Sequence, residues 1–163
     1  MLERTSRTPY DDEYATCERA VAELLIYGVD LDPDEVSRRL GIEPSDAATT
    51  GQVRTNSLGL QRVTPIGHWF LSSEEHIDSR DLRRHLDWLL NLLTPRAAML
   101  RELQALPGFR MHINCIWWSK YGDGGPTLWP EHMRGIADLD MELGLEVGFY
   151  GEEEVDERAS ASQ

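Results

Sequence analysis

Two arginines and two histidines are the residues of this chain whose side chains and positions could support ligand binding or catalysis. The segment 47–67 contains Arg54 and Arg62 and no acidic residue, although the protein carries a net charge of −13. Guanidinium groups bind carboxylates and phosphates, so this segment could hold an anion; a solvated loop is the alternative. His68 and His112 lie in two predicted strands and could meet as a weak metal or acid–base pair, with surface histidines as the alternative.

Recognisable catalytic signatures are absent from the sequence. No histidines show the helical spacing of a zinc protease, and no Gly-x-Ser-x-Gly motif is present. The "YGDGGP" turn at 121–126 lacks the Lys-Ser/Thr end of a phosphate loop and carries Asp123, which would repel an anion. Cys17 and Cys115 are too few for a disulfide framework or a metal quartet. We therefore expect no catalytic residue, no metal and no cofactor.

Apolar periodicity predicts four strands separated by helices. The strands centre on residues 23–27, 68–73, 109–119 and 145–150, and the helices on 32–41, 79–93 with an extension to 107, and 130–143. Residues 43–67 are predicted to form a long loop that could contain a short hairpin. "LDPDEV" and "LWPEHM" share a Leu-x-Pro pattern, which suggests two β-α-β halves joined by a long helix. The predicted fold is α+β, a ferredoxin-like sandwich with a mainly antiparallel sheet of four or slightly more strands.

Composition divides the chain into three parts. We expect a flexible head over residues 1–14, a single domain over 15–150, and a disordered acidic tail over 151–163, which holds five acids and one arginine. The free thiols and the lack of an apolar signal core predict a cytoplasmic protein. The acidic charge argues against nucleic acid or an anionic membrane as partner and favours a basic surface.

The adjacent tryptophans Trp117 and Trp118 must point to opposite faces of a strand. Met111, Ile113, Cys115 and Trp117 are uniformly apolar and are predicted to face the helices, as are Leu145, Val147 and Phe149 in the last strand. The other face would expose aromatic side chains, which mark an interface, unless the 43–67 loop covers them. The predicted binding residues are Trp118, Ile116, Phe70, His68, His112, Asn114, Tyr150, Arg54 and Arg62.

The order of these segments resembles a known family. A strand leading into "LDPDEVSRRLGIEP", an isolated "WFLSS" strand, the helix "DLRRHLDWLLNLLTP" and a closing "PEHMRGIADLDMELGLEVGFY" are similar to the domain of unknown function 4279 over residues 22–150. The resemblance implies an α+β fold in small bacterial proteins and no particular chemistry. Some members resemble immunity or accessory proteins of toxin systems.

These observations predict a non-enzymatic, acidic binding protein. Its most concrete form is an immunity or inhibitor protein that binds a basic protein partner, since an acidic surface accelerates such association. The alternative is a small-ligand sensor that uses the 47–67 loop and the sheet face, and a second alternative is an enzyme. A homodimer through the open sheet face is also compatible with the sequence.

Overall fold

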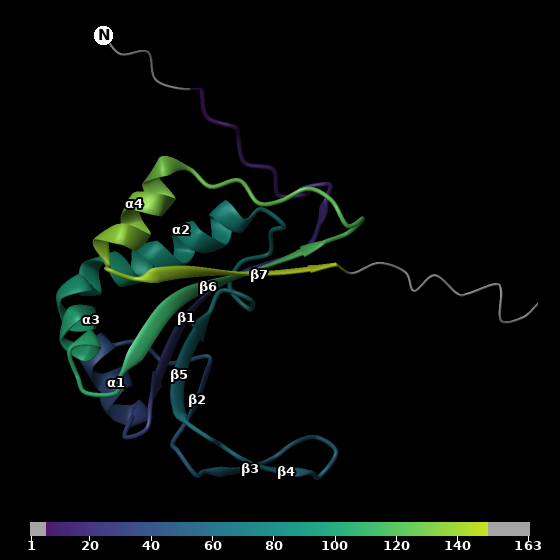
Figure 1. Ribbon diagram of the computed structural model, residues 1–163. Coiled ribbons are helices and arrows are strands. Elements are labelled where there is room, and N and C mark those ends of the chain that lie inside the picture. Colours follow the sequence, from purple (N-terminus) through teal and green to yellow (C-terminus); the bar gives the residue numbers. More distant parts are fainter. Residues whose placement is uncertain (1–5, 150–163) are drawn as a thin grey trace, which may run out of the picture.

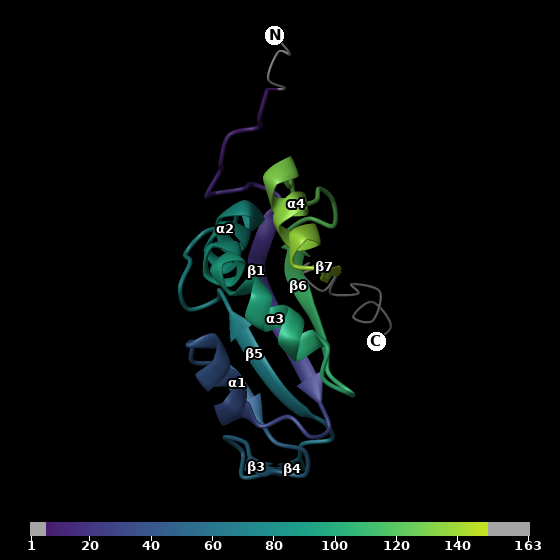
Figure 2. The ribbon, with the colours of Figure 1, turned by 90° about the vertical axis from the view of Figure 1, so that its left-hand side faces the viewer.

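The structure is a computed structural model and describes residues 6–149. The elements in chain order are β1 (Cys17–Gly28), α1 (Pro33–Leu40), β2 (Asp46–Ala48), β3 (Val53–Thr55), β4 (Gln61–Val63), β5 (Gly67–Ser72), α2 (Leu82–Leu93), a 3-10 turn (Thr94–Arg96), α3 (Ala97–Gln104), β6 (Arg110–Ser119), α4 (Pro130–Asp138) and β7 (Glu142–Phe149). The predicted α+β class is confirmed. Helices α1 to α4 cover one face of the main sheet, and the opposite face carries no helix within residues 6–149 (Figures 1 and 2).

The main sheet has five strands in the order β2-β5-β1-β6-β7. The pairs β2–β5, β5–β1 and β1–β6 are antiparallel, whereas β6 and β7 are parallel and are connected through α4. The sheet is therefore mixed, and the two predicted halves differ. Helix α1 leads from β1 into β2, which runs parallel to β1 with β5 between them, whereas α4 connects two strands that pair directly. The ferredoxin-like arrangement is not confirmed.

The core lies between the sheet and the helices. Alternate residues of β1 and β6 face the helices, and the leucines of α2 pack against them. Trp117 is 1% exposed in this layer, so the assignment of Trp117 to the core is confirmed. Because successive side chains of a strand point to opposite faces, Trp118 lies on the helix-free side.

Near the C-terminal end of the domain, the predicted helix is too long, and the helix-side residues of the last strand are left uncovered. The helix predicted over 130–143 ends at Asp138, because Asp140 has a φ of 54° and turns the chain into β7. Leu145, Val147 and Phe149 share the helix-side face but are 51%, 66% and 64% exposed. Strand β7 forms the edge of the sheet, and its far half extends past α4 (Figure 1).

Part of the predicted head packs against α2. The guanidinium of Arg83 is fully buried, pairs with Asp81 at 2.6 Å, and donates to the carbonyl oxygens of Thr8 and Pro9 at 2.6 and 2.8 Å. Burying this ion pair leaves donors that only nearby acceptors can satisfy, and the two carbonyls satisfy them. Within residues 6–149, no helix is long and apolar enough to cross a membrane.

Candidate functional site: an arginine-lined pocket at the open sheet face

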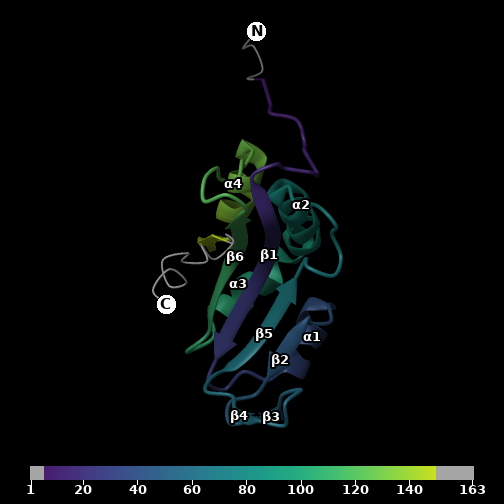
Figure 3. The same ribbon diagram turned by 90° about the vertical axis from the view of Figure 1, so that its right-hand side faces the viewer.

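The helix-free side of the main sheet, called the open face below, is organised in cross-strand rows. The register aligns His68 with Tyr27 and Tyr27 with Arg110, which places these three side chains in one row across β5, β1 and β6. The next row contains Phe70 and His112, which both pair with Leu25 of β1 between them. Figure 3 shows the three strands side by side on this face.

Four rings of these two rows pack against one another. Phe70 stacks on His68 with ring centroids 4.3 Å apart and meets Tyr27 edge-on at 5.2 Å. Tyr27 also lies nearly parallel to His112 at 6.4 Å. Such ring contacts contribute stability in addition to the effect of the apolar area that they bury. Tyr27 and Phe70 also separate the two histidines, so the predicted His68–His112 pair does not form.

A small hairpin made of β3 and β4 projects from the lower end of the sheet, on the side of the open face (Figures 1 and 3). Thr50 anchors its base, because its hydroxyl donates to the Val29 carbonyl at 2.7 Å and accepts from the Gly67 amide at 2.8 Å. The hairpin thus closes one end of the open face and does not cover the rest. The segment predicted as a long loop with a possible short hairpin contains β2 and this hairpin.

The two arginines of the hairpin stand directly opposite each other. The register pairs Arg54 of β3 with Arg62 of β4. Arg54 also forms a two-pronged salt bridge to Asp46 of β2, and Asp46 accepts a further hydrogen bond from His68 at 2.8 Å. The Arg54 guanidinium, with help from His68, lowers the pKa of Asp46 to about 2. Asp46 therefore stays ionised and neutralises Arg54, but not Arg62.

The hairpin and the open face enclose a pocket of about 320 Å³, called the hairpin pocket below. Its lining residues are Tyr27, Arg54, Arg62, Val63, Thr64, Pro65, Ile66, His68 and Arg110. No carboxylate is among these described lining residues. Among the arginines between residues 6 and 149, only Arg62, Arg101 and Arg110 form neither an ion pair nor a side-chain hydrogen bond. Two of these three unpaired arginines line this one pocket.

This arrangement suits an anion that has an apolar body. The guanidiniums offer fixed, permanently charged donors for a carboxylate or phosphate. The Val63, Pro65 and Ile66 side of the pocket offers apolar contact. Within the described part of the chain, no group of three or more His, Cys, Asp or Glu residues could hold a metal ion.

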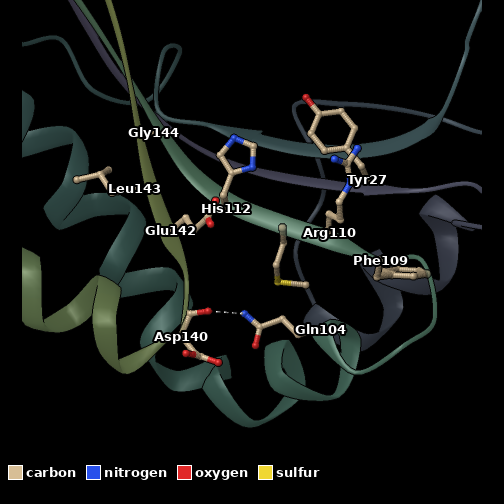
Figure 4. Close-up of a pocket in the computed structure, with 10 residues that line it drawn as sticks. Tyr27, Gln104, Phe109, Arg110, His112, Asp140, Glu142, Leu143 and Gly144 are labelled. Atoms are coloured by element: carbon tan, nitrogen blue, oxygen red, sulfur yellow. Dashed lines mark hydrogen bonds between the residues drawn. The ribbon is translucent and has the colours of Figure 1, made fainter.

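A second, larger pocket of about 680 Å³ adjoins the first and is called the notch below (Figure 4). It lies where β6 extends past the start of β7, since β7 begins opposite His112 and leaves Arg110 without a neighbour on that side. Its lining residues are Tyr27, Gln104, Phe109, Arg110, Met111, His112, Asp140, Glu142, Leu143 and Gly144. Tyr27 and Arg110 line both pockets and stand between them.

The far end of the open face has a different character. Trp118 is half-buried there; the guanidinium carbon of Arg19 lies 4.9 Å from the centre of its ring. A Cβ at Gly148 would come within 2.9 Å of Trp118, so glycine lets the indole lie across β7. Asn114 donates to Glu23 at 3.4 Å. The pKa of Glu23 is raised, mainly by burial and further by the charge of Glu146.

The structure thus distributes the predicted binding residues over two places. Phe70, His68 and His112 gather near the hairpin together with Arg54 and Arg62, whereas Asn114, Ile116 and Trp118 follow β6 away from it; Tyr150 lies outside the described residues. Sequence reasoning missed Tyr27, Arg110 and Asp46. The alternation of β6 places Arg110 on the face of His112, so this residue could have been found from the pattern.

Comparison with known proteins identifies a family but no characterised relative. No curated protein and no solved structure matches the chain. The model of one family matches residues 16–150, which include every lining residue of the hairpin pocket and the notch. The chain therefore belongs to the family described as domain of unknown function 4279.

Proposed function

We propose that the protein is a non-enzymatic binding protein that holds a small anionic ligand in the hairpin pocket. The observation that carries this proposal is the direct opposition of Arg54 and Arg62 above a pocket that also contains the unpaired Arg110. Like charges at directly opposed positions of a strand pair destabilise it. Asp46 offsets only one of them, and an anion in the pocket would offset the other.

Binding, rather than acid–base catalysis, is the function that these groups support. A guanidinium remains protonated at every physiological pH and does not exchange protons with a substrate. It contributes charge-assisted hydrogen bonds, which are worth roughly 1.5–3 kcal/mol each when a partner is ionised. Two or three such bonds, together with the apolar wall, are sufficient for a ligand of moderate affinity.

Isothermal titration calorimetry on the full chain tests this proposal. Phosphate, benzoate and hexanoate are titrated at low and at physiological salt. We expect saturable binding of at least one anion, and we expect Arg62→Met or Arg110→Met to weaken it at least tenfold. Arg101→Met is the matched control, since Arg101 is also unpaired but lies on α3 outside the pocket. Absence of saturable binding, or equal effects of all three variants, would contradict the proposal.

The basic protein partner remains a second candidate, favoured by the far end of the open face. Glu23 and Glu146 repel each other there, beside the half-buried Trp118 and the 9% exposed Ile116. A cationic group would relieve that repulsion, and the aromatic ring offers an apolar anchor. An immunity or inhibitor protein would use such a surface to mask a basic partner.

A kinetic binding assay separates the two candidates when a partner protein is in hand. Association should slow with rising salt, because exposed charges are screened over about 8 Å at physiological ionic strength. Trp118→Ala should accelerate dissociation of a protein that docks at the far end, whereas Arg62→Met should not. The reverse pattern would assign the interaction to the hairpin pocket.

A further inference from the structure

Opposite charges line the two adjoining pockets without pairing across them. The hairpin pocket holds the unpaired Arg62 and Arg110, and the notch holds Asp140 and Glu142. Among residues 6–149, neither of these carboxylates forms an ion pair or a side-chain hydrogen bond. Figure 4 shows Tyr27 and Arg110 on one side of the notch, and Asp140 and Glu142 on the other.

The sheet register sets the separation of these charges. Glu142 pairs with His112, two residues along β6 from Arg110. Neighbouring strands lie about 4.8 Å apart and residues rise about 3.3 Å each, so the Cα atoms of Arg110 and Glu142 are about 8 Å apart. Tyr27 lies beside Arg110 and His112 lies beside Glu142, and their rings are nearly parallel with centroids 6.4 Å apart. Both rings line the notch, so a ligand that reaches Glu142 from the hairpin pocket passes next to them.

We propose that the ligand is a zwitterion, with its anionic group in the hairpin pocket and an ammonium or other cationic group in the notch at Glu142. This inference rests on the proposed function, because the anionic end uses the same arginines. It adds two requirements: the ligand carries a cationic group at its other end, and it is long enough for that group to reach Glu142. A ligand of this class binds with its body across Tyr27 and His112.

The geometry makes two demands that a simple anion does not meet. A short zwitterion leaves its ammonium beside Arg110, where like charges repel, and it gains nothing from Glu142. A longer zwitterion places the ammonium beyond Arg110, against Glu142, with Asp140 reinforcing the negative potential of the notch. Affinity should therefore depend on both the presence of the ammonium and its distance from the carboxylate.

Calorimetry with matched pairs of ligands tests this inference on the full chain. The probes are butanoate, hexanoate and octanoate, each compared with the aminoalkanoate of the same length that carries a terminal amine. For the six- or eight-carbon pair we expect the ammonium to increase affinity at least fivefold, and for the four-carbon pair we expect no increase. Glu142→Gln should remove the increase and leave alkanoate affinity within about twofold.

Glu102→Gln is the control variant, since Glu102 is an exposed residue of α3 outside both pockets. It should retain the increase that the ammonium brings. If alkanoates bind but the ammonium adds no affinity at any length, the inference is overturned and the anion site stands. If Glu142→Gln retains the increase, the inference is also overturned. If neither series binds, the proposed function itself fails.

Discussion

Arg54 and Arg62 face each other across β3 and β4, and only Arg54 has a carboxylate partner, Asp46. An isolated two-stranded hairpin is marginally stable, so a pair of opposed cations is a cost to the fold. Thr50 and Asp46 hold the hairpin in place despite this repulsion. The arrangement is the one expected where a ligand, rather than the fold, uses the second arginine.

Replacing Arg62 should therefore stabilise the unliganded protein. Arg62→Met removes the repulsion from Arg54, and opposed pairs of this kind change the free energy of unfolding by roughly 0.2–1 kcal/mol. Urea denaturation at low salt measures the change, and Arg101→Met should leave stability nearly unchanged. A loss of stability in Arg62→Met would show that Arg62 supports the hairpin.

The two adjacent tryptophans should differ sharply in their contribution to stability. Trp117 is 1% exposed and packs in the core, so Trp117→Ala should cost about 3–5 kcal/mol. Its indole N–H has no hydrogen-bond partner among the described residues, so the loss is one of packing. Trp118→Ala should cost much less. Equal shifts of the two denaturation midpoints would refute the assignment of faces.

Both cysteine thiols should be unreactive in the folded protein. Burial raises the pKa of Cys17 to about 11 and that of Cys115 to about 12, so neither forms the reactive thiolate at neutral pH. Labelling by a thiol-specific disulfide reagent should proceed only as fast as the protein opens, and denaturant should accelerate it. Rapid labelling of either residue at pH 7 would count against this environment.

The same shifts predict how stability depends on alkaline pH. The unfolded thiols titrate near about 8.5, so the raised pKa values favour the folded state below that pH. This stabilising effect is lost as the pH rises from about 8.5 through the folded pKa values of about 11 and about 12. Cys115→Ala should reduce the fall in unfolding free energy above pH 9. An unchanged slope would contradict the assigned cause.

Neutralising Glu146 should lower the pKa of Glu23. Burial is the largest cause of the raised Glu23 pKa, and the charge of Glu146 contributes in the same direction. Glu146→Gln should therefore bring the pKa part of the way toward its ordinary value, as measured by NMR of the side-chain carboxyl carbon. A full return to the ordinary value would mean that burial contributes little.

The faces of β6 could be predicted from sequence, because strand alternation requires no knowledge of neighbouring strands. Trp117 and Trp118 were separated correctly on this basis. The shortage of acids around Arg54 and Arg62 also indicates an anion-binding segment, whereas the pairing of β3 with β4 does not follow from composition.

What alternation cannot predict is which strands are neighbours and what covers each face. Tyr27 and Arg110 meet only because β1 pairs with β6 in one particular register, which long-range topology determines. The notch exists because β7 starts two residues later than β6 along the shared edge. Val147 has the pattern of a core residue yet is 66% exposed, since no helix covers that part of the edge strand.

An NMR titration of the full chain with hexanoate tests the central claim most directly, because backbone amide shifts report where the anion binds. The account predicts saturable shifts that are largest at residues 53–55 and 61–68, at Tyr27 and at Arg110, and that disappear in the Arg62→Met/Arg110→Met double variant. Arg101→Met should behave as the unmodified protein. Shifts that centre elsewhere, or that persist unchanged in the double variant, would contradict the claim that the hairpin pocket is the binding site.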